Sequence, residues 1–544
     1  MNKVAHYLQE HLSGEVTTSP EVRRHFSQDA SVLRLPPLVV VYPRNENDVR
    51  KVTRFAWQLA ERGKILPITA RGGGSDTSGA ALGSGILLVF TAHMDRILSL
   101  NAKTEIVSIE SGIRYDKLEQ ALYTHGLFLP PYPASHKYAT LGGGIANNAI
   151  GEKSVKYGPT SDYVEQLRVV LSNGEVIETH PLSHRELNRK MGLATFEGEV
   201  YRAMDTLLEE NHELIENTAK KIKSAYNSSG YNLFDIRVKG GFDLTPLMVG
   251  SQGTLGIITE ATLEVVPHNP LTHVALASFD TLPGFEAALK KILELKPSVC
   301  EMINGTAISR VSELNPQQLA GLVDNPTAAM HLIVEFDDRR DGAQKKLIKK
   351  LKKIVDKAGG SCRSASEVEQ QEKIWMVRES ISTLMGHPTG PAKIVPIAED
   401  VSVPLSALTK FLDKAGEIYR SQRLNAAVWG HAGEGVIRMQ PMLDLSQIGD
   451  RQKLFRISED IYSLVGELGG SLSAGHGDGR MRTPYLDKMY SRDFCELIAK
   501  VKKIFDPHGI LNPGVKTGSS KEDIKKLLRG DYNLGHRHEH LPRS

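Results

Sequence analysis

Cysteine is scarce in this sequence: only three occur in 544 residues, at Cys300, Cys362 and Cys495. Their wide separation excludes a disulfide framework and a Cys-x-x-Cys knuckle for zinc or an iron–sulfur cluster. Free thiols suit a reducing compartment. Any redox chemistry in this chain therefore has to use a cofactor other than an iron–sulfur cluster of its own.

Long apolar runs are also missing. No window approaches the roughly 18 uninterrupted apolar residues of a membrane-spanning helix, and residues 1–10 lack the apolar core of a secretory signal. We expect a cytoplasmic protein without an integral membrane segment. Peripheral membrane contact through the basic segment 521–529 is the open alternative.

A strong excess of either charge is absent as well. The 67 Lys and Arg residues nearly balance the 64 Asp and Glu residues, which leaves a formal net charge of +3. This balance disfavours a nucleic-acid partner. The length allows two or three domains, each with its own core.

Glycine is concentrated in three clusters of the first half, at residues 71–79, 140–148 and 250–256. In the first cluster, Arg71 precedes Gly72, Gly73 and Gly74, so bare backbone N–H groups follow a cation, an arrangement that suits a phosphate or pyrophosphate. One large diphosphate ligand that touches all three clusters is the simplest interpretation. If only one cluster were present, plain turns would explain it better.

Two commoner nucleotide motifs do not account for these clusters. The first cluster lacks the G-x-G-x-x-G spacing of a Rossmann fold. Residues 151–154 end like a P-loop, but Glu152 separates the glycine from the lysine, and Ala146 stands where the first glycine is required.

The hydrophobic pattern predicts an α+β protein with a boundary near residue 269, where Pro267 and Pro270 interrupt the chain. Before the boundary, strands are expected at 38–42, 65–69, 86–90, 106–109, 167–171 and 176–179, with helices at 47–62 and 115–124. After it, strands at 272–279 and 331–336 alternate with helices at 284–295 and 341–358. This second pattern predicts an antiparallel sheet covered by helices on one side.

Several segments resemble the FAD-linked enzymes of the p-cresol methylhydroxylase and vanillyl-alcohol oxidase superfamily, in the D-2-hydroxyacid dehydrogenase branch. They are residues 26–31, 37–43, 253–260, 429–435, 473–477 and 504–514. The resemblance implies a two-subdomain PCMH-type FAD-binding domain at 36–269 and an α+β substrate domain with an antiparallel sheet at 270–516. A helical lead-in at 1–35 and a basic tail at 517–544, with His536, His538 and His540, complete the expected organisation.

The same resemblance implies which residues bind FAD. They are Arg71, Gly72, Gly73, Gly74, Ser75, Gly79, Thr140, Gly142, Gly143, Asn147, Asn148, Gly250, Gly253, Thr254, Ile257 and Asn512. Gly73 and Gly74 would let backbone N–H groups approach the pyrophosphate. Some members of the superfamily tether the flavin through a histidine in the first cluster. No histidine is present there, so we expect noncovalent FAD.

The resemblance also supplies catalytic candidates. Arg378 ends a Trp-x-x-Arg motif, and Lys393 follows 15 residues later, the spacing of a cation pair for a substrate carboxylate. An ion pair of Arg378 with Glu379 or Glu372 at the surface is the alternative. His476 lies between two glycines at the position of the base that removes the hydroxyl proton.

One departure from the family concerns its metal site. Metal-dependent members use His-x-Gly-x-x-x-x-His and a glutamate before the catalytic histidine. Here His431 is kept, but Arg438 and Gly475 replace the other two ligands. Arginine has no lone pair for a cation, so we expect no metal and a role for Arg438 as a positive charge near the substrate oxygens.

These features together predict FAD-dependent oxidation of a small D-2-hydroxy acid, such as D-lactate, to the 2-oxo acid, with hydride transfer to flavin N5. The electrons would pass to an external acceptor: a quinone, a cytochrome, oxygen or a separate protein. A sugar or alcohol oxidase, a non-redox flavin synthase and a flavin-binding protein without turnover are the alternatives. The sequence leaves the oligomeric state open between a monomer and a homodimer.

Overall fold

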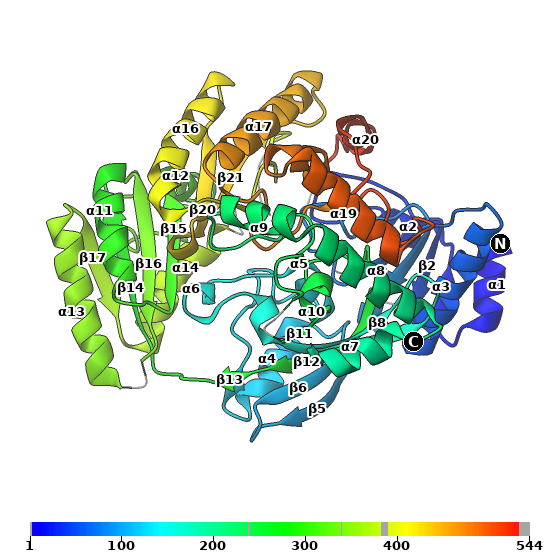
Figure 1. Cartoon of the computed structure of the whole chain (residues 1–544). Helices are drawn as coiled ribbons and strands as arrows, with labels where there is room; N and C mark the ends of the chain where they lie inside the picture. Colours follow the sequence, from blue (N-terminus) through cyan, green and yellow to red (C-terminus); the bar gives the residue numbers. More distant parts are fainter. Residues whose placement is uncertain (1–2, 238–239, 339, 382–383, 385–389, 533–544) are drawn as a thin grey trace.

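The computed structural model describes residues 3–237, 240–338, 340–381, 384 and 390–532. The described chain is an α+β fold in which two smaller sheets and a large third sheet lie side by side with helices packed around them (Figure 1). The predicted tail histidines His536, His538 and His540 lie outside the described residues.

The first sheet has the order β1-β2-β4-β3, and β2, β4 and β3 run parallel. Its strands are β1 (Glu15–Thr17), β2 (Val39–Tyr42), β3 (Ile68–Arg71) and β4 (Ile86–Val89). Helix α3 (Glu46–Glu61) begins at an Asn45 cap and buries Val49, Val52 and Ala56 in the core with this sheet. Because β3 ends at Arg71, the first glycine cluster starts at the carboxyl end of a parallel strand, where α/β sheets commonly bind ligands.

The second sheet is antiparallel, in the order β5-β6-β12-β8-β9. Its strands are β5 (Ile97–Asn101), β6 (Ile106–Glu110), β8 (Val164–Val170), β9 (Val176–Thr179) and β12 (Ile257–Glu264). The predicted hairpin is confirmed, since Val170 pairs with Val176 on either side of Asn173-Gly174. Strand β12 follows the third glycine cluster directly, and α5 (Leu141–Asn147), which contains the second cluster, contacts it. The two sheets thus bring all three clusters to one place.

The third sheet has the order β17-β14-β16-β15-β20-β21-β18, with β19 also paired to β21, and every pair is antiparallel as predicted. Its strands are β14 (His273–Phe279), β15 (Val299–Asn304), β16 (Met330–Phe336), β17 (Ser361–Ala365), β18 (Lys393–Ile394), β19 (Val401–Ser402), β20 (Ala426–His431) and β21 (Val436–Leu443).

The prediction that helices cover one side of this sheet is wrong, because helices cover both sides. Helices α11 (Leu282–Leu293) and α13 (Asp341–Lys357) pack with Ala275 and Ala277, while α12 (Gly305–Leu314) and α14 (Val368–Glu379) pack with Val274 and Leu276. Successive residues of one strand point to opposite faces. A strand that is apolar without alternation, as β14 is, is buried on both faces.

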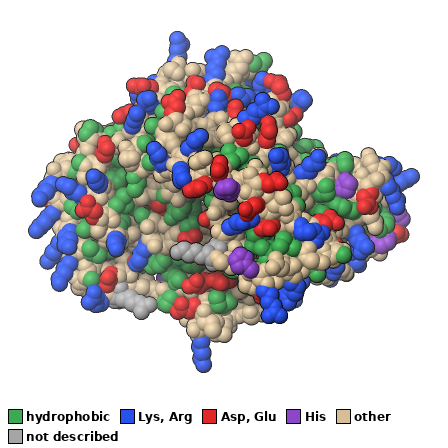
Figure 2. Space-filling model, viewed as in Figure 1, with side chains coloured by type: hydrophobic (Ala, Val, Ile, Leu, Met, Phe, Trp, Pro, Cys, Tyr) green, Lys and Arg blue, Asp and Glu red, His purple; other side chains and the backbone are tan. Residues whose placement is uncertain are grey.

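The remaining helices fill the space between and around the sheets. They include α1 (Lys3–His11), α2 (Pro20–His25), α4 (Tyr115–Tyr123), α6 (Ser154–Tyr157), α7 (His184–Met191), α8 (Phe196–Glu210), α9 (His212–Lys221), α10 (Thr245–Met248), α16 (Leu408–Ser421), α17 (Ile448–Glu467), α18 (Gly479–Arg482), α19 (Arg492–Phe505) and α20 (Lys521–Leu527). Among the described helices, none combines the length and the apolar character that a bilayer crossing requires. Figure 2 shows acidic and basic side chains interspersed over most of one face, with a basic group at the left edge, where Figure 1 places α13.

The C-terminal segment returns to the first half of the chain after the third sheet is complete. Helix α19 packs on α8 and α9, and Leu511 forms a parallel bridge with Ile68 of β3. Lys502 on α19 donates to the carbonyl oxygens of Thr254 (2.7 Å) and Leu511 (2.6 Å) and to Asp506 (2.5 Å). One buried ammonium group therefore ties the third glycine cluster to the returning segment.

Replacing Lys502 with alanine should destabilise the protein, because Asp506 would stay buried without its counter-charge. Breaking a buried ion pair commonly costs about 3–5 kcal/mol. We expect a lower midpoint in chemical denaturation. The Thr254 carbonyl oxygen in the third cluster would also lose its hydrogen bond from Lys502. Lys503→Ala, which removes the exposed neighbouring lysine on the same helix, is the matched control. Equal midpoints for the two variants would contradict this role of Lys502.

Candidate active site

The three glycine clusters line one pocket. Eleven of the residues predicted to bind FAD line it: Arg71, Gly72, Gly73, Gly74, Ser75, Thr140, Gly142, Gly143, Asn147, Gly253 and Ile257. The other five, Gly79, Asn148, Gly250, Thr254 and Asn512, are not among its lining residues. Of the catalytic candidates, His476 lines the pocket, whereas Arg378, Lys393, His431 and Arg438 do not.

The glycines of the first cluster are required by neighbouring protein atoms. A Cβ at Gly72 would collide with the Thr140 side chain, and one at Gly73 would collide with the carbonyl oxygen of Tyr138. Close approach to a pyrophosphate was the expected reason for glycine here. The structure shows instead that these glycines let the first and second clusters pack directly on each other.

Two other glycines face open space in the pocket. A Cβ at Gly143 would have only the Thr140 hydroxyl within 4 Å, at 3.2 Å, and one at Gly253 only the Ala70 methyl group, at 3.9 Å. A larger side chain at either position would enter the pocket. These are the positions where the backbone offers the closest approach to a ligand.

Arg71 lines the pocket, and its guanidinium also binds backbone oxygens around it. The guanidinium donates to the carbonyl oxygens of Gln28 (2.7 Å), Ala81 (3.3 Å) and Phe26 (3.4 Å). Gly74 has a φ of +70° and lies against that guanidinium. Arg71 thus holds the N-terminal segment to the first cluster, and its predicted contact with FAD stays a prediction.

Asn512 was expected to contact FAD, but it is not among the residues that line the pocket. Its amide nitrogen donates to the carbonyl oxygens of Ala80 and Gln252, both at 2.9 Å. Gln252, which does line the pocket, donates to the Asn147 side chain (2.9 Å) and to the carbonyl oxygen of His476 (3.1 Å). Asn512 and Gln252 therefore fix the clusters relative to one another and to the loop that carries His476.

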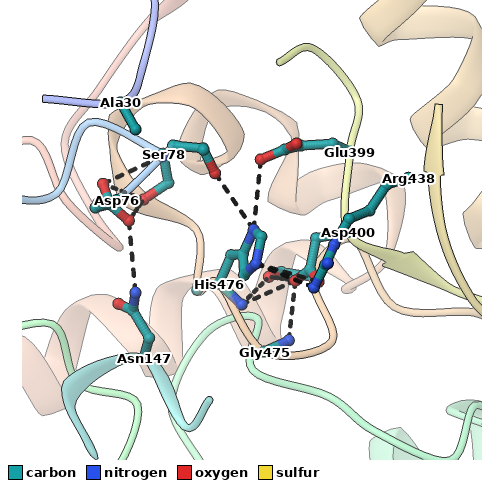
Figure 3. A network of polar contacts seen from close by, with 12 residues as sticks. Ala30, Asp76, Ser78, Asn147, Glu399, Asp400, Arg438, Gly475 and His476 are labelled. Carbon is teal, nitrogen blue, oxygen red and sulfur yellow. Dashed lines mark hydrogen bonds and ion pairs between the residues drawn. The ribbon is translucent and has the colours of Figure 1, made fainter. Parts of the chain in front are cut away.

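His476 lies at the pocket wall with both ring nitrogens in polar contacts (Figure 3). Its Nδ1 is 3.4 Å from Glu399 and 3.3 Å from the Thr77 hydroxyl, and its Nε2 is 3.3 Å from Arg438. Arginine can only donate a hydrogen bond, so Nε2 is the acceptor nitrogen and Nδ1 carries the proton. In this tautomer the Nε2 lone pair accepts the hydrogen bond from Arg438.

Asp400 organises the loop that carries His476 (Figure 3). Its Oδ2 accepts hydrogen bonds from the backbone N–H groups of Ala474 (3.1 Å), Gly475 (2.9 Å) and His476 (2.8 Å), and from the Ser473 hydroxyl (2.9 Å). Burial favours the neutral acid, but the charges of His476 and Arg438 and these hydrogen bonds outweigh it, so the pKa of Asp400 is lowered. The loop is thus wrapped around an ionised carboxylate.

Glu399 is the second carboxylate beside His476. It is fully enclosed and also accepts a hydrogen bond from Gln440. Burial raises its pKa, but His476 and Arg482 outweigh this effect and lower the pKa to about 2. An ionised Glu399 stabilises the proton on Nδ1 of His476, as carboxylates do for many catalytic imidazoles.

Arg438 is buried on β21, with one guanidinium nitrogen 3.3 Å from His476 and 3.7 Å from Asp400. Its Nε has no hydrogen-bond partner among the described residues. Arg438 therefore lies next to His476, and its role near the substrate oxygens stays a prediction.

Arg378 and His431 occupy a separate buried cluster around Glu301. The Arg378 Nε donates to Glu301 at 2.7 Å and lies 3.6 Å from Glu152, and His431 Nδ1 contacts the other oxygen of Glu301. Burial lowers the pKa of His431 despite the adjacent Glu301. Arg378 is buried, so the surface ion pair with Glu379 or Glu372 is wrong, while its role as a carboxylate clamp stays a prediction.

Lys393, the second predicted cation of that clamp, is only partly buried and donates to the carbonyl oxygen of Gly390 at 2.8 Å. It lies next to residues 385–389, which are outside the described part of the chain. Its predicted pairing with Arg378 around a substrate carboxylate stays a prediction.

The three-ligand metal set of relatives does not fit these residues. In the part of the chain that the structure describes, no three His, Cys, Asp or Glu side chains are grouped to hold a metal ion. A Cβ at Gly475 would lie 2.7 Å from the Ile150 side chain and 2.9 Å from its backbone nitrogen. A glutamate at this position would therefore need the backbone to move, which gives a physical reason for glycine there.

The pocket is suited to FAD in shape and chemistry. Gly143 and Gly253 leave room for a ligand to approach the backbone, while Phe90, Ile257 and Ile258 offer an apolar wall. Such a mixture of apolar lining and few polar groups is usual for cofactor sites.

Sequence reasoning missed Glu301, Glu399 and Asp400. A signal existed for Glu301, because it is the only charged residue in the apolar strand Val299–Asn304 and is completely buried. Buried charges are paired or functional. Glu399 and Asp400 precede a short strand and carry no local pattern, so only the folded chain reveals them.

Comparison with known proteins agrees with this arrangement. Residues 37–180 match a family model described as an FAD binding domain, and residues 269–515 match one described as FAD linked oxidases, C-terminal domain. D-2-hydroxyglutarate dehydrogenase of Escherichia coli (strain K12) is 32% identical over 531 residues, which cover 93% of this chain and 50% of that protein. The chain thus spans about half the length of this relative.

Other matches extend over nearly whole proteins. D-lactate dehydrogenase of Archaeoglobus fulgidus is 26% identical over 88% of this chain and 90% of that protein. The crystal structure of p-cresol methylhydroxylase with substrate bound has a TM-score of 0.69 at 14% identity, covering 96% of this chain and 97% of that one, and supports the fold. With both family models matched in order around the observed pocket, the chain carries an FAD binding domain followed by the C-terminal domain of FAD linked oxidases, and FAD is its cofactor.

Proposed function

We propose that the protein oxidises a small D-2-hydroxy acid to the 2-oxo acid and holds its FAD noncovalently. The observation that carries the proposal is His476, a base-ready imidazole at the wall of the flavin pocket between Glu399 and Arg438. Relatives named for D-2-hydroxyglutarate and D-lactate support the substrate class and leave its member open. The absence of histidine from residues 71–79 supports noncovalent attachment.

FAD, when bound, would supply the hydride acceptor for the oxidation of the alcohol carbon. The protein's task is to remove the hydroxyl proton. His476 Nε2 accepts this proton, and Glu399 stabilises the resulting positive charge on the imidazole through Nδ1. Asp400 positions the ring by fixing the backbone of residues 474–476.

Arg438 is the cation placed to meet the substrate's oxygen atoms. It cannot lose its charge and lies next to the nitrogen that accepts the proton. A permanent positive charge there stabilises an alkoxide-like oxygen and a neighbouring carboxylate, part of what a metal does in related enzymes. We assign the substrate carboxylate to Arg438 in place of the predicted pair Arg378 and Lys393.

The electrons leave to an external acceptor in this proposal. Cys300, Cys362 and Cys495 are dispersed, and all three are free, so they do not assemble an iron–sulfur relay. A quinone, a cytochrome, oxygen or a separate protein completes the turnover.

Anaerobic mixing with D-lactate, D-2-hydroxyglutarate and glycolate tests the function directly. At least one of them should bleach the absorbance of the oxidised flavin, because a dehydrogenase reduces its cofactor without oxygen. The L-enantiomers of the chiral acids should react far more slowly. A flavin that stays oxidised with every D- and L-2-hydroxy acid would reject the proposed reaction.

Gly143→Val should give a folded protein without FAD. The branched side chain meets little protein at this position and projects into the pocket. Acid precipitation of the parent protein should release a yellow supernatant, and the variant should release none. Gly342→Val, at an open surface position with nothing within 4 Å, should keep full flavin occupancy. Normal occupancy in Gly143→Val would place the flavin elsewhere.

His476→Ala should slow substrate-driven flavin reduction by about two to four orders of magnitude, because the proton acceptor is lost. FAD should remain bound, since other residues form most of the pocket. Stopped-flow absorbance measures the rate, and His212→Ala, an exposed histidine on α9, is the control. Near-parental reduction in His476→Ala would remove this histidine from the mechanism.

A further inference from the structure

Thr77 brings a hydroxyl group of the first glycine cluster to the imidazole of His476. It lines the flavin pocket and is half-buried. Its Oγ1 lies 3.3 Å from Nδ1 of His476, while Arg438 contacts the other ring nitrogen. The proton transfer described above makes no use of this hydroxyl, although it contacts the ring that accepts the proton.

The backbone around Thr77 is fixed by the carboxylate of Asp76. This carboxylate accepts hydrogen bonds from the backbone N–H groups of Ser78 (3.1 Å) and Ala80 (2.8 Å) and from the Ser78 hydroxyl (2.8 Å). An aspartate that binds the backbone just after it closes a tight turn. Figure 3 shows Asp76 and Ser78 of this turn near His476. The turn gives the Thr77 side chain a defined position.

The same turn is joined to the segment that follows His476. The carbonyl oxygen of Ser78 accepts hydrogen bonds from the backbone N–H groups of Arg480 (2.9 Å) and Met481 (3.1 Å). Thr77 is therefore held at a fixed distance from the loop of His476. Because the turn belongs to the first glycine cluster, a wall of the flavin pocket and the imidazole are held in one frame.

The direction of the hydrogen bond at Nδ1 follows from the tautomer of His476. Arg438 can only donate, so Nε2 is the acceptor nitrogen and Nδ1 carries the proton. The Thr77 oxygen therefore accepts a hydrogen bond from Nδ1. A hydroxyl that accepts one hydrogen bond can donate another through its own O–H, so Thr77 can connect the imidazole to a further acceptor.

Glu399 is that acceptor. Its Oε1 lies 3.4 Å from Nδ1 of His476, and no shorter hydrogen bond to this oxygen is present among the described residues. Burial raises the pKa of Glu399, but His476, Arg482 and a hydrogen bond with the Thr77 side chain outweigh burial and lower the pKa. Buried carboxylate oxygens need donors, and the Thr77 hydroxyl is placed to be one.

We propose that Thr77 is a positioning residue for the oxidation: its hydroxyl bridges the Nδ1 proton of His476 and Glu399, and so keeps the imidazole in the tautomer and orientation in which Nε2 accepts the substrate's proton. This inference rests on the proposed oxidation of a 2-hydroxy acid with His476 as its base. It gives the first glycine cluster a second task, because one turn of the pocket wall also orients the base.

Thr77→Val tests the proposal, because it removes the hydroxyl and keeps the shape of the side chain. With the 2-hydroxy acid that reduces the parent flavin fastest, its limiting rate of anaerobic flavin reduction should fall by about three- to tenfold, as expected for one lost hydrogen bond. Thr77→Ser keeps the hydroxyl and should react at close to the parental rate. Thr104→Val, at an exposed threonine, is the matched control, and all variants should keep their FAD.

The His476→Ala background separates positioning of the base from a direct effect on flavin or substrate. Without the imidazole, the Thr77 hydroxyl has no ring to orient. His476→Ala and the double variant His476→Ala/Thr77→Val should therefore reduce their flavin at equal, slow rates, since the two substitutions act through one unit. A loss from Thr77→Val that is as large in this background as in the parent would contradict the positioning role.

Two further outcomes overturn the proposal while the oxidase function stands. One is a parental rate in Thr77→Val. The other is loss of FAD from Thr77→Val but not from Thr77→Ser, since the hydroxyl would then belong to the cofactor site. If Thr77→Val does not fold, Thr77→Ala gives the same comparison. A parent whose flavin is reduced by no 2-hydroxy acid rejects the proposed function, and this role of Thr77 with it.

Discussion

The backbone of residues 72 and 73 lies against residues 138–140 so closely that no side chain can be placed between them. The flavin pocket depends on this contact. It joins the end of a parallel strand in the first sheet to the helix that rests on the second sheet. Arg71, Gln252 and Asn512 then fasten the joined loops to the N-terminal segment and to the C-terminal return. A cofactor cradle is thus formed between two sheets that share few direct strand contacts.

Next to the flavin pocket, the third sheet contributes charged side chains. Its β20 and β21 strands carry His431 and Arg438, and the loop before β19 carries Glu399 and Asp400. Buried carboxylates balance each of the arginines near His476, so the region is close to neutral before substrate binds.

The local sequence pattern predicted the bounds of a helix or strand well where the residues of that element determine where it begins and ends. The helix predicted at 341–358 is observed at Asp341–Lys357, and the strand predicted at 86–90 at Ile86–Val89. The strand predicted at 65–69 is shifted to Ile68–Arg71, because pairing of Ile68 with Ile86 and of Arg71 with Val89 fixes its register from outside. The glycine clusters and His476 could be found from motifs. The partners of Arg71 and Arg378 could not, since Gln28 and Glu301 come close to them only through the tertiary fold.

The parallel bridge between Ile68 and Leu511 has a consequence for biosynthesis. Strand β3 emerges from the ribosome more than 400 residues before its neighbour at Leu511. The first sheet therefore lacks its contact with Leu511 until the strands of the third sheet have been translated. Contacts this distant in sequence slow folding and expose unfinished edges to aggregation. The lining of the flavin pocket is complete only after Gly475 and His476 have been translated.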